Sequence, residues 1–148
     1  MRRIVYSLLQ YRHSLLRSDT FNIGIVFYFP DEGDKMLFYC SPNIKALKSL
    51  YPDMDYQMLI TYLSYINDNV QRGRIRHYMG TSVDVELKIF LKKYVLLEDA
   101  TVLRFDEPVI ISNIEHGKSI DMLKNYTKVL LSFRDGNEYN QISNLLMQ

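Results

Sequence analysis

The sequence contains a single cysteine, Cys40, and no tryptophan. One thiol cannot form an internal disulfide, so a disulfide-stapled secreted domain is excluded, and so are zinc sites built on several thiolates. No apolar run approaches the roughly 18 residues that a membrane-spanning helix needs. The first apolar run is broken at Gln10 and Arg12 with no small-residue cleavage site after it, which argues against a signal peptide. We therefore expect a cytoplasmic protein without membrane contact.

Neither sign of charge dominates, because 18 Lys and Arg residues stand against 17 Asp and Glu residues and the formal net charge is +1. This balance does not call for a nucleic acid or an anionic membrane as partner, so such a function would have to rest on a local cluster. Glycine-rich phosphate loops and Gly-x-Ser-x-Gly patterns are also missing. Their absence counts against nucleotide hydrolases, Rossmann dehydrogenases and α/β hydrolases.

The chain has three histidines, His13, His77 and His116, and each is isolated from metal-ligand neighbours at helical spacing. A general acid–base pair of His13 with Asp19 is conceivable, but surface histidines are the favoured interpretation. Cys40 ends an apolar strand and is expected to be a buried, inert thiol. We predict no catalytic residue, no metal site and no cofactor.

The chain does contain many apolar residues: 47 % of its 148 residues are hydrophobic, and 12 are tyrosine. This length and composition are typical of one folded domain. We predict a single α+β domain over residues 1–148, in which 135–148 is a candidate tail or link to a region outside this sequence. The oligomeric state stays open.

Strands are predicted at residues 4–11, 21–29, 36–40 and 101–105, and a short extended piece at 109–111. Helical spacing of apolar residues occurs over residues 44–51, 58–70, 83–94 and 120–131. This order predicts an antiparallel sheet of about four strands packed against about three to four helices. Period-two spacing in the second strand predicts one buried core face, with Asn22, Gly24, Val26 and Tyr28 on the other face. The core face contains Phe21, Ile23, Ile25, Phe27 and Phe29.

The helix over 58–70 carries more aromatic residues than one buried stripe uses. Its predicted stripe contains Met58, Leu59, Leu63 and Ile66. Tyr56, Tyr62 and Tyr65 widen the stripe and are candidates for a partner-binding surface, because tyrosine offers apolar area and keeps its hydroxyl wet. The alternative is that these rings cover the rim of the core. In the helix over 83–94, Tyr94 is expected to face inward and Glu86 to lie mostly elsewhere.

The group Asp19-x-x-Asn22-x-Gly24 lies at a strand entrance. Asp19 and Asn22 are candidate binding residues for a ligand or a partner backbone, with Gly24 permitting close approach. The favoured alternative is structural, with Asn22 bonded to a neighbouring loop and Gly24 making room for a crossing helix or marking a bulge. An enzyme with its site near Asp19, Asn22 and Arg104 is a third-ranked hypothesis.

A basic segment follows the helix over 58–70 and contains Arg72, Arg74, Arg76, His77 and Tyr78. Arginines beside an aromatic ring suit phosphate contact and base stacking, so this segment is the candidate nucleic-acid site. Lys88, Lys92 and Lys93 would extend it if the next helix folds back. The favoured alternative is a solvated loop, because no nucleic-acid fold signature is present.

The segments Tyr6–Tyr11 and Asp19–Val26 resemble the start of domain of unknown function family 3037. That family shows a Tyr-Ser strand and then an acid, two residues, Asn, an aliphatic residue and Gly; Asp19 stands where it usually has Glu. Leu103–Pro108 and the following helix are similar to the family's ending. The resemblance implies no established activity. Members are bacterial and are often encoded beside a kinase-like protein related to persistence toxins, which implies such a partner by association.

Together these observations favour a non-enzymatic protein-binding or regulatory module with a protein partner. The alternative is a nucleic-acid-binding or nucleic-acid-processing domain that uses the basic segment 72–78.

Overall fold

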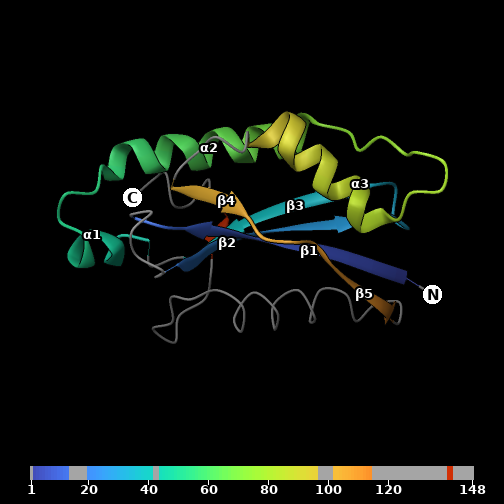
Figure 1. Ribbon diagram of the computed structural model, residues 1–148, viewed down its shortest axis with the longest axis horizontal. Coiled ribbons are helices and arrows are strands. Elements are labelled where there is room, and N and C mark those ends of the chain that lie inside the picture. The colour runs from blue at the N-terminus through green and yellow to red at the C-terminus, as the bar shows by residue number, and fades with distance from the viewer. Residues whose placement is uncertain (1, 14–19, 42–43, 97–101, 115–139, 142–148) are drawn as a thin grey trace.

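The computed structural model describes residues 2–13, 20–41, 44–96, 102–114 and 140–141. Within these residues, six strands form one antiparallel sheet in the order β4-β1-β2-β3-β6, with β5 also paired to β1 (Figure 1). The strands are β1 (Arg2–Tyr11), β2 (Phe21–Phe29), β3 (Lys35–Cys40), β4 (Leu103–Phe105), β5 (Val109–Ile114) and β6 (Asn140–Gln141). The predicted α+β class with an antiparallel sheet is confirmed, and the sheet has more strands than expected.

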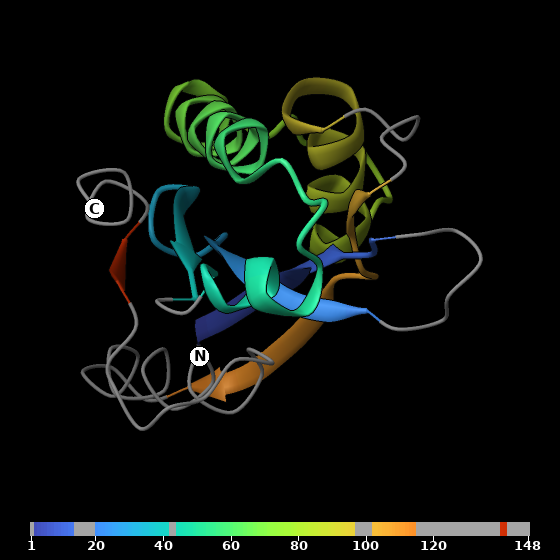
Figure 2. The same cartoon turned by 90° about the vertical axis from the view of Figure 1, so that its left-hand side faces the viewer.

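The helices are α1 (Ala46–Leu50), α2 (Tyr56–Arg72) and α3 (Val83–Phe90), and α3 continues into a π-helical turn, η1 (Leu91–Val95). Figure 2 shows α2 and α3 side by side on one face of the sheet. The predicted helix over 120–131 and the segment 135–148 lie outside the described residues, apart from the two residues of β6.

Local chemistry explains the bounds of α2. The Asp55 carboxylate accepts a hydrogen bond from the backbone N–H of Met58 at 3.0 Å, which caps the first turn. The helix ends at Gly73, whose N–H donates to the Asn69 carbonyl. Leu59, Leu63, Ile66 and Val70 are buried against the sheet, as helical spacing predicts.

The turn between β2 and β3 is short, and it contains two residues with positive φ, Gly33 at 71° and Asp34 at 57°. Glycine and aspartate tolerate this left-handed region better than most residues. The turn brings Phe29 opposite Lys35 and aligns β2 with β3 as far as Gly24 and Cys40. It also holds the Asp34 carboxylate at one end of the hairpin.

The burial predicted for Ile23, Ile25, Phe27 and Phe29 is confirmed, but the expectation of a single core face is wrong, because both faces of β2 are buried. Val26 and Tyr28 belong to the large cluster beneath the helices, whereas Ile25, Phe27 and Phe29 pack with Ile4 on the opposite face. The register shifts where Leu9 pairs with Gly24 and Gln10 with Asn22, a β-bulge that turns Ile23 toward the helices. Alternation cannot identify the core side of a strand buried on both faces.

Candidate functional site

One flank of α2 carries an exposed row of large side chains. Met58 is 51 % exposed, Tyr62 45 % and Tyr65 67 %. At the helical repeat these three residues share a row with Asn69 and Arg72, while the buried residues occupy the neighbouring row. We call Met58, Tyr62 and Tyr65 the tyrosine face.

Two details of the sequence prediction for α2 change. Met58, predicted in the buried stripe, points to solvent, whereas Tyr62 and Tyr65 are exposed, as the partner-surface hypothesis requires. Tyr56 lies on the opposite flank, is half-buried and packs against the core, which raises the pKa of its hydroxyl. Tyr56 therefore covers the rim of the core and is not part of the tyrosine face.

The basic link, residues 72–78, runs from the end of α2 toward α3. Arg72, Arg74 and Arg76 are exposed, whereas Ile75 between them is 6 % exposed and belongs to the core. Within the described part of the chain, none of these three guanidinium groups forms an ion pair or a hydrogen bond. Their charges are therefore available to an anionic partner.

The basic link borders an open groove of about 430 Å³. Its floor and walls come from α2, the link, α3 and η1, and the lining residues are Asn69, Arg72, Gly73, Arg74, Ile75, Arg76, Phe90 and Tyr94. Tyr94 is 49 % exposed, so the expectation that it faces inward is wrong. Because α3 gives way to the π-helical turn η1 directly after Phe90, extrapolation of regular helical spacing fails at Tyr94.

Gly73 decides how closely α3 approaches the basic link. A Cβ atom at this position would lie 2.2 Å from Cζ of Phe90 and 2.8 Å from the carbonyl oxygen of Asn69. Asn69 also donates to the carbonyl oxygen of Val95 at 3.5 Å. The groove and the tyrosine face therefore adjoin, because Asn69 and Arg72 belong both to the exposed row of α2 and to the groove lining.

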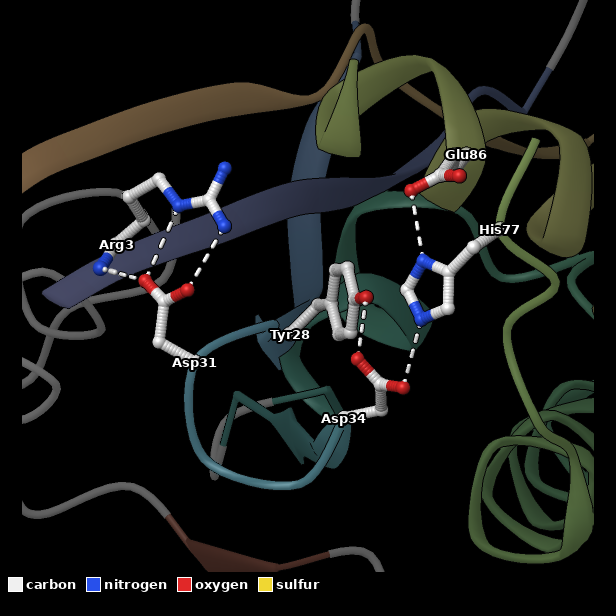
Figure 3. A network of polar contacts seen from close by, with 6 residues as sticks. All are labelled: Arg3, Tyr28, Asp31, Asp34, His77 and Glu86. Atoms are coloured by element: carbon white, nitrogen blue, oxygen red, sulfur yellow. Dashed lines mark hydrogen bonds and ion pairs between the residues drawn. The ribbon is translucent and has the colours of Figure 1, made fainter. Parts of the chain in front are cut away.

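A polar network fastens the basic link to the β2–β3 turn (Figure 3). The Nε2 atom of His77 lies 2.8 Å from Asp34, and its Nδ1 atom lies 3.0 Å from Glu86. Tyr28 donates its hydroxyl to Asp34 at 2.8 Å, and the N–H of Tyr78 donates to Glu86 at 2.7 Å. Both nitrogens of the imidazole thus contact carboxylates of other segments, and we call His77, Asp34 and Glu86 the clamp.

The charges in this clamp stabilise one another. Hydrogen bonds to Asp34 and Glu86 raise the pKa of His77 above its ordinary value. Burial acts to raise the pKa of Asp34, but hydrogen bonds from His77 and Tyr28 outweigh it and lower that pKa. Glu86 is only 3 % exposed, which contradicts the expectation that it lies on the outer side of α3. The carboxyl group of Glu86 is satisfied at this buried position by its contacts with Nδ1 of His77 and the N–H of Tyr78.

His13 forms a second, smaller network. Its Nδ1 atom is 2.8 Å from the Tyr11 hydroxyl, and its Nε2 atom is 3.0 Å from the Asp53 carboxylate. The ring stacks on Tyr51 with centroids 4.2 Å apart. The carboxylate that contacts His13 is thus that of Asp53, whereas Asp19, the partner considered from the sequence, lies outside the described residues. Again both ring nitrogens are occupied.

Asn22 and Arg104 are brought together through Gln10. The Gln10 amide donates to Asn22 at 3.2 Å and accepts from Nε of Arg104 at 3.3 Å, so a polar ladder crosses β2, β1 and β4. A Cβ atom at Gly24 would lie 3.1 Å from the Phe38 ring. Gly24 therefore lies beside the bulge and makes room for a ring on the neighbouring strand, rather than for a helix.

The remaining candidates offer little chemistry. Cys40 is buried, and burial raises the pKa of its thiol well above the usual range. Lys88 pairs with Glu107 at 2.6 Å instead of extending the basic link. In the described ranges, no group of three His, Cys, Asp or Glu side chains could hold a metal ion. None of the helices in these ranges is long and apolar enough to cross a membrane.

Sequence reasoning missed Asp34, Glu86 and Asn69 as parts of the site. The sequence did contain a signal that Asp34 occupies a special position. An Asp that follows Gly in a tight turn can adopt positive φ, which marks a backbone conformation that few residue types tolerate. Glu86 offered a weaker one, since it occurs at buried helical spacing beside Val83, Leu87 and Phe90. Nothing local marked Asn69.

Comparison of the chain with protein-family models, with curated proteins and with solved structures found no match. The resemblance to domain of unknown function family 3037 therefore stays a prediction.

Proposed function

We propose that this protein is a non-enzymatic module that binds another protein through the tyrosine face and the adjoining groove. The main support is that Tyr62 and Tyr65 are 45 % and 67 % exposed on a helix whose other side is packed into the core. Covering these rings would remove apolar area from water, while each hydroxyl could still find a partner. Tyrosine and arginine also contribute disproportionately to binding energy at protein interfaces.

A protein partner is favoured over a nucleic acid by the local chemistry. Phe90 is only 2 % exposed, but Tyr78 and Tyr94 are 40 % and 49 % exposed beside the arginines, so base stacking alone does not separate the two partners. The exposed carboxylate of Asp68 lies on α2 between Tyr65 and Arg72 and would repel phosphates. The net charge of +1 adds no long-range attraction.

An enzymatic role is disfavoured by the state of the candidate reactive groups. His13 and His77 use both ring nitrogens in hydrogen bonds, and the Cys40 thiol is buried. A general base must lie within hydrogen-bond reach of the substrate proton, and here protein side chains occupy both nitrogens of each ring. We therefore infer that the protein acts by binding a partner at its surface rather than by catalysis.

The test is recovery of a partner from the native host with the tagged full-length chain. We expect wild type and the control variant Gln57→Ala/Gln71→Ala to retain the same partner protein, and Tyr62→Ala/Tyr65→Ala to lose it. The control removes two exposed side chains from other flanks of the same helix. The resemblance noted above makes a kinase-like protein the first partner to test with purified components.

Retention of the partner by the tyrosine variant would contradict the proposal. So would a wild-type dimer in light scattering that Tyr65→Glu dissociates, because the tyrosine face would then bind a second copy of this chain. Recovery of nucleic acid with no protein would favour the nucleic-acid alternative.

A further inference from the structure

In the described residues, the backbone polar groups in the middle of the basic link have no protein partner. Within the described residues, the N–H and C=O groups of Arg74, Ile75 and Arg76 form no hydrogen bond. They lie between Gly73, whose N–H bonds to Asn69, and Tyr78, whose N–H bonds to Glu86. Unpaired backbone groups in an exposed, extended segment are a template for another strand.

The link has the side-chain pattern of a strand. Gly73 has extended dihedrals, with φ −76° and ψ 160°. Beyond it, exposed Arg74, buried Ile75 and exposed Arg76 alternate with period two. This pattern places the two arginines on the outer side while Ile75 anchors the segment in the core.

Both ends of the link are fastened. Gly73 is held against Phe90, and His77 is clamped between the β2–β3 turn and α3. A segment already held in its binding conformation loses little further entropy when a partner binds.

We propose that the basic link accepts an extended, acidic segment of the partner protein as an added strand. The segment's backbone would pair with Arg74, Ile75 and Arg76, and its carboxylates would meet the guanidinium groups of the three arginines. Alternate side chains of an extended peptide recur at the same spacing as Arg74 and Arg76, so the charges stay in register. This inference rests on the proposed function, for which it names the partner's chemistry.

The probe is a fluorescein-labelled peptide of alternating Glu and Val, titrated with the full-length chain by fluorescence anisotropy at low salt. Controls are the same peptide with Lys in place of Glu, the Glu peptide N-methylated at alternate backbone positions, and single-stranded oligo(dT). Variants are Arg74→Gln/Arg76→Gln and, as a matched loss of two exposed charges, Lys45→Gln/Lys48→Gln on and beside α1.

We expect binding of the Glu peptide that falls about tenfold or more in the arginine variant, since each arginine would lose a charge-assisted hydrogen bond. The lysine variant should bind the Glu peptide with an affinity within about twofold of wild type. The Lys peptide should bind weakly, and so should at least one Glu peptide N-methylated at alternate positions, because N-methylation removes the backbone donors of an added strand. Circular dichroism checks folding of the arginine variant, whose melting should match wild type because no described ion pair is lost.

Absence of Glu-peptide binding, equal binding by the arginine variant, or tighter binding of oligo(dT) would overturn the inference. The two proposals fail separately. If the partner is lost only with Tyr62→Ala/Tyr65→Ala and kept by Arg74→Gln/Arg76→Gln, the tyrosine face stands and the added strand is wrong. If the arginine variant alone loses both peptide and partner, the link stands and the tyrosine face is wrong.

Discussion

His77 shows how one side chain can hold two distant segments together. It contacts Asp34, which precedes it by 43 residues, and Glu86, which lies on the next helix. The imidazolium form satisfies both carboxylates at once, because each ring nitrogen then carries a proton. We therefore expect the protonation of His77 to couple pH to the attachment of the basic link.

We predict that His77→Gln removes part of the pH dependence of stability. The pKa of His77 in the folded protein is raised above its ordinary value of 6.5. Its contribution to stability is therefore complete below about pH 6.5 and is lost as pH rises through the folded pKa. The difference in unfolding free energy between wild type and variant should be largest on the acid side of neutrality and shrink toward pH 9, in urea unfolding at several pH values.

The control is His13→Gln, which leaves the clamp intact. That variant should keep the alkaline loss of stability that we expect for wild type. A difference between wild type and His77→Gln that stays constant with pH would show that the clamp does not depend on the charge of His77.

At the scale of elements, α2 has two sides with different tasks. Leu59, Leu63, Ile66 and Val70 attach it to the sheet, while the tyrosine face remains on the surface. Replacing a side chain by alanine should therefore change the unfolding free energy by different amounts at neighbouring positions of this helix.

We predict that Leu63→Ala costs about 2–5 kcal/mol of unfolding free energy, through lost burial plus a cavity. Leu63 is 0 % exposed. Tyr65→Ala should change stability by no more than about 0.5 kcal/mol, because its ring contributes little to the packed core. Urea unfolding followed by circular dichroism measures both, and a Tyr65→Ala cost near that of Leu63→Ala would place this ring in the core.

At the scale of the whole molecule, the sheet joins segments that are far apart in the chain. β1 pairs with β2 on one edge and with β4 and β5 on the other, and Ser7 donates to the carbonyl oxygen of Asp106 at 2.7 Å. Arg3 closes the other end of β1, since its guanidinium and backbone N–H both donate to Asp31 at 2.8 Å. This contact ties β1 to the β2–β3 turn.

We predict that Asp31→Asn reduces the loss of stability in acid. Hydrogen bonding by Arg3 lowers the pKa of Asp31 from 3.8 to about 2. The stability that ionised Asp31 contributes is therefore present above about pH 3.8 and is lost as pH falls toward 2. Unfolding midpoints between pH 2 and 6 should decline less steeply for Asp31→Asn than for wild type, from a lower starting value. Asp68→Asn is the control and should follow the wild-type slope; an equal slope for Asp31→Asn would contradict the prediction.

Much of the fold was predictable from the sequence, because the relevant signals are local. Alternating apolar residues located β2 and β3, and helical spacing over residues 58–70 located α2. The arginines of the basic link were recognisable as a cluster because they lie two residues apart. Each of these features depends on neighbours within a few positions, where propensity and periodicity act directly.

The sequence by itself determined that the chain forms an α+β domain with an antiparallel sheet and an arginine-rich link after its longest described helix. Only the tertiary structure decided which face of β2 meets the helices, that Tyr56 is half-buried while Tyr65 is exposed, and that Glu86 is buried. The physical reason is that burial depends on what packs opposite a residue. His77 illustrates this, because its two carboxylate partners approach it only when the β2–β3 turn and α3 are folded against the same link.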